Sequence, residues 1–168
     1  MLFKKCFTTL SLLVLLSLSA QAEQPALNAF TSGSYRQILA KHTQEPFMLV
    51  IWSTTCPSCV KDMTLLNALH KSWPKLKMVL LATDVITDAE QVQTILAKHE
   101  LTGLENWVFA EDNTQKLNYE IDPEWYGELP RTYFFDAAHG RQGMSGVLSK
   151  QDYESLFAKI LKPSVKAY

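Results

Sequence analysis

Cys56 and Cys59 enclose a Cys-Pro-Ser-Cys tetrad and are the side chains whose type and spacing most directly indicate chemistry. Residues three apart on a helix lie on one face, so the two sulfurs can close a disulfide within a single turn. At a helix start, free backbone N–H groups and the helix dipole lower a cysteine pKa from about 8.5 to roughly 3.5 to 7.5. The tetrad therefore predicts an activated thiol, Cys56, with a second thiol within reach.

The residues around the tetrad predict the elements that must position it. Residues 47–52 form an apolar run typical of a buried strand, and residues 53–55 form a short polar loop. Apolar residues at helical spacing then continue from Cys59 to about Ser72, where a Trp-Pro pair ends the predicted helix. This order of strand, loop and helix places Cys56 at the helix start.

The rest of the chain alternates in the same way and predicts a three-layer α/β/α domain with a central mixed sheet. A crossover from residues 47–52 to a second buried strand at 77–83 implies a parallel pair, and a glycine turn implies an antiparallel pair near the C-terminus. The other predicted elements are a lead-in strand within 23–33, a helix capped by Ser34, a helix capped by Thr87-Asp88, a short strand at 107–110, a helical turn at 114–119, strands at 131–136 and 141–148, and a helix capped by Ser149 and ended by Pro163.

The N-terminal residues 1–22 are typical of a cleavable secretory signal peptide. Two lysines precede an uncharged run, and Ala20-Gln21-Ala22 provides a small-x-small cleavage signal. The alternative is an uncleaved membrane anchor, but the strongly apolar part, residues 10–18, is shorter than the ~20 residues of a spanning helix. We therefore expect an exported, periplasmic chain with one domain at residues 23–168.

The cysteine count and the charge agree with that expectation. Cys6 would leave with the signal peptide, and a mature chain with two cysteines in an export compartment suggests disulfide chemistry. The 16 basic and 17 acidic residues give a net charge of −1, and no basic patch favours nucleic acid.

The segment Trp52 to Cys59, the Leu129-Pro130 pair before an apolar strand, the region of Gly146 and the terminal helix resemble the thioredoxin fold. Within it, the chain is similar to TlpA/ResA-like periplasmic thiol-disulfide oxidoreductases over residues 26–162. The separation of Cys59 and Pro130 is longer than in plain thioredoxins and too short for the helical insert of DsbA-like oxidases.

The resemblance implies roles for four residues. Cys56 would be the exposed nucleophile and Cys59 the buried resolving thiol. Pro130 would be a cis-proline that faces the disulfide and whose loop pairs with the substrate backbone. Asp62 occupies the place where many relatives have a glutamate suspected of moving protons for the buried thiol.

The surroundings of the pair depart from the family pattern. Thr55 stands where a tryptophan often precedes the first cysteine, and Val50 stands where plain thioredoxins bury an aspartate. The candidate substrate-binding residues are Trp52, which we expect to pack beneath the active loop, Thr55, Leu129 and Arg131, and Glu128 flanks them.

The resemblance implies a reductase for disulfides of exported proteins, with a membrane electron donor of the DsbD or CcdA type and no metal or organic cofactor. A weak thiol oxidase or isomerase is the main alternative, because the residues between the cysteines tune the redox potential.

Three different roles for the cysteines fit the residues less well. A purely structural disulfide would close a very small loop and stabilise little. A zinc site or a Sco-like copper chaperone would need further ligands, whereas the four histidines are scattered and predicted at surfaces or edges. A peroxiredoxin-like peroxidase could use Ser53, Cys56 and Arg131, but it lacks that family's proline before the motif.

Overall fold

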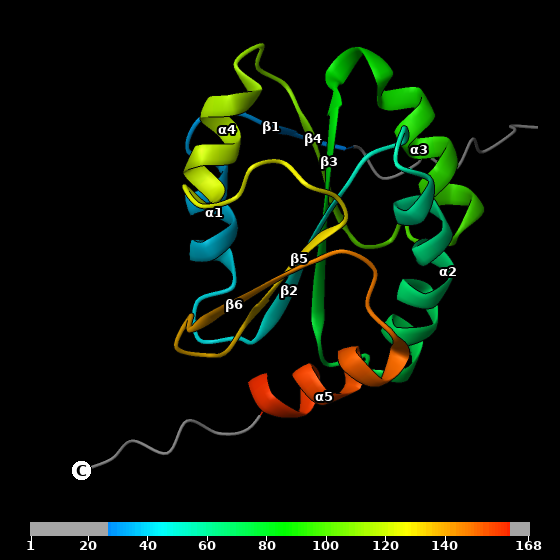
Figure 1. Ribbon diagram of the computed structural model, residues 1–168, viewed down its shortest axis with the longest axis vertical. Coiled ribbons are helices and arrows are strands. Elements are labelled where there is room, and N and C mark those ends of the chain that lie inside the picture. The colour runs from blue at the N-terminus through cyan, green and yellow to red at the C-terminus, as the bar shows by residue number, and fades with distance from the viewer. Residues whose placement is uncertain (1–26, 162–168) are drawn as a thin grey trace, which may run out of the picture.

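The computed structural model describes residues 27–161, and its strands form one six-stranded mixed sheet (Figure 1). The strands are β1 (Asn28–Phe30), β2 (Phe47–Trp52), β3 (Lys77–Val85), β4 (Glu105–Phe109), β5 (Arg131–Phe135) and β6 (Arg141–Ser145). Their order across the sheet is β1-β4-β3-β2-β5-β6. The first four in this order run parallel, whereas β5 is antiparallel to β2 and β6 is antiparallel to β5.

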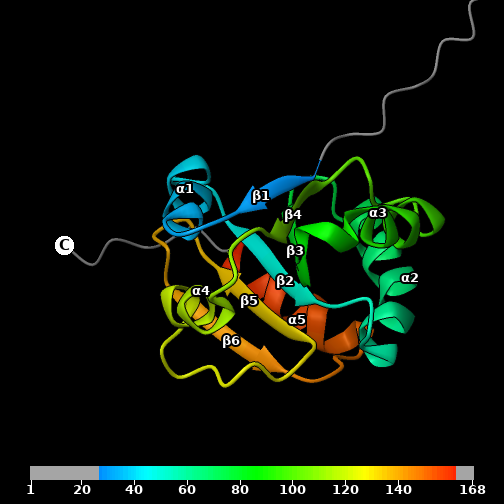
Figure 2. The same cartoon turned by 90° about the horizontal axis from the view of Figure 1, so that it is seen from above.

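Helices cover both faces of the sheet (Figures 1 and 2). The helices are α1 (Ser34–Lys41), α2 (Pro57–Ser72), α3 (Ala89–Lys98), α4 (Thr114–Ile121) and α5 (Lys150–Ile160), and a 3-10 turn, η1 (Ile86–Asp88), precedes α3. Buried side chains of α2, α3 and α5 pack in one core cluster, and those of α1 and α4 pack in a second cluster. The predicted three-layer α/β/α architecture is confirmed.

The central strand β2 explains why its sequence is continuously apolar. All six of its residues are buried, because β3 and β5 flank it and helices cover both of its faces. Met48, Val50 and Trp52 point into the cluster of α2 and α5, whereas the alternate residues point into the cluster of α1 and α4. The cysteine loop thus directly follows a strand that is buried on both faces.

Three elements are longer than the sequence pattern predicted. β3 continues through Asp84 to Val85, and β4 begins at Glu105 and pairs with both β1 and β3. α4 runs to Ile121, because Leu117 and Ile121 give its otherwise polar surface one buried stripe. The predicted helical turn at 114–119 is therefore part of a longer helix.

The helix caps were predicted with mixed success. Ser149 and Asp152 form the predicted capping box at the start of α5. Ser34, by contrast, is the first helical residue of α1, and Gly33 occupies the cap position with a φ of 89°. A left-handed backbone of this kind favours glycine. Because Ser34 is not the cap residue, its side chain accepts from the Thr31 amide instead.

The position of His42 also differs from the prediction. We expected it at a surface or edge, but it is 6% exposed. Its ring stacks on Phe47, with 4.7 Å between the centroids, and its Nε2 lies 3.2 Å from a Glu105 carboxylate oxygen. His42 is therefore a core residue with a carboxylate partner, and it lies at the end of the sheet where β2 begins.

Two predictions fall outside residues 27–161: the signal peptide at 1–22 and the helix end at Pro163. Within residues 27–161, no helix combines the length and apolar character needed to cross a membrane.

Candidate active site

Cys56 is the N-cap residue of α2, as the order of strand, loop and helix predicted. Its backbone is extended, with φ −101° and ψ 99°, and Pro57 occupies the first helical position. Cys56 and Cys59 form a disulfide with their Cα atoms 5.2 Å apart. The Cys59 backbone N–H also donates to the Cys56 sulfur over 3.2 Å.

The two sulfurs differ in their access to solvent. Cys59 is 1% exposed and packs in the core cluster of α2 and α5, whereas Cys56 is partly exposed. The Ser58 hydroxyl lies 3.3 Å from the Cys56 sulfur. Because the helix N-terminus and the Cys59 amide both favour a negative sulfur, Cys56 is the thiol suited to attack and to leave as a thiolate.

The sheet register brings Pro130 to the same end of the sheet as the cysteines. Arg131 pairs with Ile51, so Pro130 lies at the end of β2 beside the start of the cysteine loop. The Leu129–Pro130 peptide bond is cis. The Gly146 N–H donates to the Pro130 carbonyl over 2.8 Å, which fixes the proline loop against the connection from β6 to α5.

Asp62 lies on the buried face of α2, one turn after Cys59. The residue is 6% exposed, and its carboxyl group accepts a hydrogen bond of 3.0 Å from the Tyr153 hydroxyl of α5. Burial raises the pKa of Asp62, although the bond from Tyr153 opposes this effect. An aspartate with a raised pKa can exchange a proton closer to neutral pH than an exposed one.

The raised pKa of Asp62 predicts a pH-dependent effect on stability. Burying the ionised carboxylate is unfavourable, and this cost is absent below the unfolded pKa of about 3.9 and complete above the higher folded pKa. We therefore expect Asp62→Asn to gain stability relative to the wild type as pH rises from about 4 to about 8. Urea unfolding of the two oxidised proteins at both pH values measures this difference, and a pH-independent difference would contradict it.

Asp84 is a site residue that the sequence patterns did not single out. It ends the buried part of β3 and is 9% exposed. Its carboxylate accepts from the Ser53 hydroxyl over 3.1 Å, from the Thr54 N–H over 3.0 Å and from the Thr54 hydroxyl. The signal was present in the sequence, because the ends of adjacent parallel strands meet at one edge, and Asp84 closely follows the second buried run.

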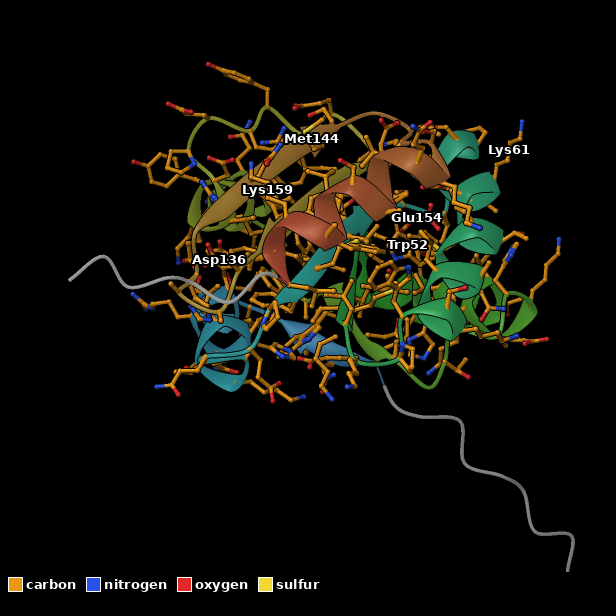
Figure 3. All side chains as sticks on the ribbon, turned by 90° about the horizontal axis from the view of Figure 1, so that it is seen from below. Trp52, Lys61, Asp136, Met144, Glu154 and Lys159 are labelled. Atoms are coloured by element: carbon orange, nitrogen blue, oxygen red, sulfur yellow. A yellow bond between two sulfur atoms is a disulfide. The ribbon has the colours of Figure 1, made fainter. Side chains whose placement is uncertain are left out.

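The predicted substrate-binding residues differ in their placement. Thr55 is exposed and Leu129 is partly buried against both core clusters. Trp52 is 1% exposed, and Figure 3 places it inside the molecule, whereas Lys61 of α2 points outward. Trp52 thus supports the cysteine loop from beneath, as expected, and does not itself face a partner.

Arg131 is held in a network beneath the proline loop. Its guanidinium lies 3.2 Å from a carboxylate oxygen of Asp122, 2.7 Å from the Ser145 hydroxyl and 4.7 Å from the centre of the Tyr133 ring. The Arg141 guanidinium also lies 3.2 Å from a carboxylate oxygen of Asp122 and 5.0 Å from the centre of the same ring. The Arg131 side chain is therefore bonded within the protein through both of its terminal nitrogens.

Asp122 is the centre of this network. It is 5% exposed and also accepts from the Tyr133 hydroxyl over 2.8 Å. Burial opposes ionisation, but the Tyr133 hydroxyl, a backbone amide and the two guanidiniums together hold the pKa of Asp122 below its usual value. The network fixes the chain that leads from α4 to Pro130.

Within residues 27–161, no group of three or more histidine, cysteine, aspartate and glutamate side chains is arranged to hold a metal ion.

The arrangement of these elements matches that of solved structures. A thiol:disulfide interchange protein of the thioredoxin family from Chlorobium tepidum superposes with a TM-score of 0.60 over 74% of this chain and 85% of that chain, at 19% identity. The chain has a thioredoxin fold. Relative to β2, this thioredoxin fold places the cysteine loop, Pro130 and Asp84 at one end of the sheet.

Other neighbours with a thioredoxin fold come from different bacteria. A secreted disulfide oxidoreductase of Mycobacterium tuberculosis, homologous to E. coli DsbE, superposes with a TM-score of 0.59 over 71% of this chain and 85% of that chain, at 19% identity. StoA from Bacillus subtilis gives a TM-score of 0.51 at 13% identity over 68% of this chain and 83% of that chain. No protein-family model matches the sequence, and no curated protein matches it either.

Proposed function

We propose that the protein is a thiol-disulfide oxidoreductase that reduces disulfides of exported proteins through Cys56 and Cys59. The observation that carries this proposal is the asymmetry of the pair. One sulfur is partly exposed at a helix N-terminus and the other is 1% exposed behind it. A thioredoxin fold shared with named disulfide oxidoreductases supports the same chemistry.

The proposed reaction transfers two electrons in two exchange steps. The Cys56 thiolate attacks one sulfur of a substrate disulfide, the substrate S–S bond breaks, and its second sulfur leaves as a thiolate. Cys59 then loses its proton and attacks the Cys56 sulfur in the mixed disulfide. The products are a reduced substrate dithiol and the Cys56–Cys59 disulfide.

Asp62 is our candidate for the group that accepts the Cys59 proton. Its position one turn after Cys59, its burial and its raised pKa support this role. The Tyr153 hydroxyl orients the carboxyl group and stabilises its ionised form, which is the form that can accept a proton. No metal or organic cofactor enters this reaction.

The Leu129-Pro130 loop is our candidate for the surface that binds substrate backbone. Within residues 27–161, the Leu129 backbone N–H and C=O form no hydrogen bond, so an extended substrate could use them. Thr55 is exposed beside the pair, and Arg131 and Glu128 border the loop. These residues would contact the substrate near its disulfide.

We further propose that the protein works in the periplasm after cleavage of residues 1–22. The apolar run after Lys4 and Lys5 supports export, and one structural neighbour is described as secreted. A reductase in an oxidising compartment needs an external source of electrons. We infer a membrane donor of the DsbD or CcdA type, which would reduce the Cys56–Cys59 disulfide by the reverse of the same exchange.

The direction of electron flow is tested by the redox potential of the pair. The mature protein is equilibrated with glutathione buffers, and the fraction of free Cys56 and Cys59 is read by alkylation and mass spectrometry. We expect a potential well below that of the DsbA oxidase, in the direction of the thioredoxin value of about −270 mV. A value near about −120 mV would contradict a reductase and favour an oxidase.

A further inference from the structure

All three residues of the loop before Cys56 are organised by one buried carboxylate. Ser53 and Thr54 donate three hydrogen bonds to Asp84. The single hydroxyl hydrogen of Ser53 is used in this way, so the Thr55 hydroxyl, 2.9 Å away, must donate to the Ser53 oxygen. The Thr55 N–H also donates to that oxygen, over 3.2 Å.

The same loop fixes the start of α2. The Cys56 N–H donates to the Ser53 carbonyl over 3.1 Å, so the residue bonded to Asp84 also sets the backbone of the attacking cysteine. β2 and β3 are parallel, with Trp52 paired to Ala82, and this register brings Asp84 beside the loop. The pairing of β2 with β3 therefore places Asp84 where it can hold the loop that precedes Cys56.

The charge of Asp84 has only neutral partners in the described structure. Its hydrogen-bond donors are two hydroxyl groups and a backbone amide. None of the ion pairs among residues 27–161 includes Asp84. A buried charge without a cationic partner is weakly compensated, and its field acts on nearby groups.

We propose that Asp84 is a positioning residue that holds the Ser53–Thr55 loop and whose negative charge opposes formation of the Cys56 thiolate. The field of Asp84 thus counteracts the stabilisation that the α2 N-terminus gives to the thiolate. A less stable thiolate means a less stable reduced protein, which makes the pair a stronger electron donor. This inference rests on the proposed exchange function and gives the reductive direction a physical cause.

The test compares two variants that disturb the same loop, only one of which removes the charge. Asp84→Asn removes the charge and keeps the shape, so we expect the Cys56 pKa to fall by about half a unit. Above that pKa, the equilibrium with glutathione should shift about threefold toward the reduced protein. Thr54→Val keeps the charge and removes one donor to it, so the Cys56 pKa should stay the same or rise.

The Cys56 pKa is read from the pH profile of its alkylation rate, and the equilibrium is read in glutathione buffers. A purely mechanical role for Asp84 would loosen the loop in both variants and shift both in the same direction, which would overturn the proposal. Unchanged values in a folded Asp84→Asn protein would overturn it as well. If Asp84→Asn fails to fold, Thr54→Val decides alone, because a fall in its Cys56 pKa contradicts the proposal.

The two proposals fail in different ways. A wild-type protein that does not exchange with glutathione or with protein disulfides would contradict the proposed function itself. Normal exchange in the wild type, with the variants behaving alike, would contradict only the role of Asp84.

Discussion

Cys59→Ser is expected to become covalently trapped on its substrates, whereas Cys56→Ser is expected to lose exchange altogether. In Cys59→Ser the partly exposed Cys56 can still attack a disulfide, but no second thiol is present to release the mixed disulfide. In Cys56→Ser the remaining thiol is 1% exposed and cannot meet a protein disulfide. Incubation with a disulfide-bonded test protein, acid quenching and mass spectrometry of the adducts measure both results.

We expect both variants to keep the wild-type fold, so each serves as a control for the other. A serine hydroxyl at position 56 can still accept the Cys59 N–H, so the cap of α2 is preserved. Neither variant should lose much stability, because the disulfide closes a loop with only two intervening residues. Adducts on Cys59 in the Cys56→Ser protein would reverse the assigned roles of nucleophile and resolving thiol.

Asp122→Ala is expected to lower the free energy of unfolding by about 3 kcal/mol. The substitution leaves the guanidiniums of Arg131 and Arg141 without their shared carboxylate and the Tyr133 hydroxyl without its acceptor. Removing one partner of a buried ionic network costs about 3 to 5 kcal/mol, and we expect the lower end because both arginines are partly exposed. Urea unfolding of the oxidised protein at neutral pH measures the loss.

Two control variants separate charge from hydrogen bonding in this network. Tyr133→Phe removes one bond to Asp122 and should cost about 1 kcal/mol. The pKa of Asp122 is lowered, so the ionised carboxylate stabilises the fold above the unfolded pKa of about 3.9. That contribution is lost as pH falls through the lower folded pKa, so Asp122→Asn should approach the wild type in acid. An equal deficit at all pH values would rule out the ionic network as its cause.

The fold could be predicted largely from local patterns. The buried run of residues 47–52 reads as a central strand because every one of its residues is covered, and the face of Val92 and Leu96 marks α3. Element ends were less predictable. The end of β3 and the start of β4 are polar, and strand pairing, which the local sequence does not reveal, extends both strands.

The site residues also divide into those that the local sequence predicts and those that depend on strand pairing. The cysteine pair and its place at a helix start follow from the spacing of a few neighbouring residues. Asp84 follows a predicted parallel strand and could have been placed at this edge of the sheet, although its bonds to Ser53 and Thr54 depend on the register. Asp122 could not be assigned from the sequence, because its partners depend on which strands become neighbours. His42 was misjudged for the same reason, since Glu105, which binds it, belongs to a distant strand.

The position of β1 in the sheet has a consequence for the order of folding. Among residues 27–161, β1 lies at the sheet edge and pairs with β4 alone, and the Asn28 side chain donates to the Asn106 carbonyl over 3.0 Å. Within the described part of the chain, β1 therefore has no strand partner until residues 105–109 have been made and placed against β3. Closing so long a loop is slow, because its entropy is lost before the contacts form. A growing chain can thus assemble β2, α2 and β3, with the cysteines in place, while its N-terminal segment remains free of the sheet.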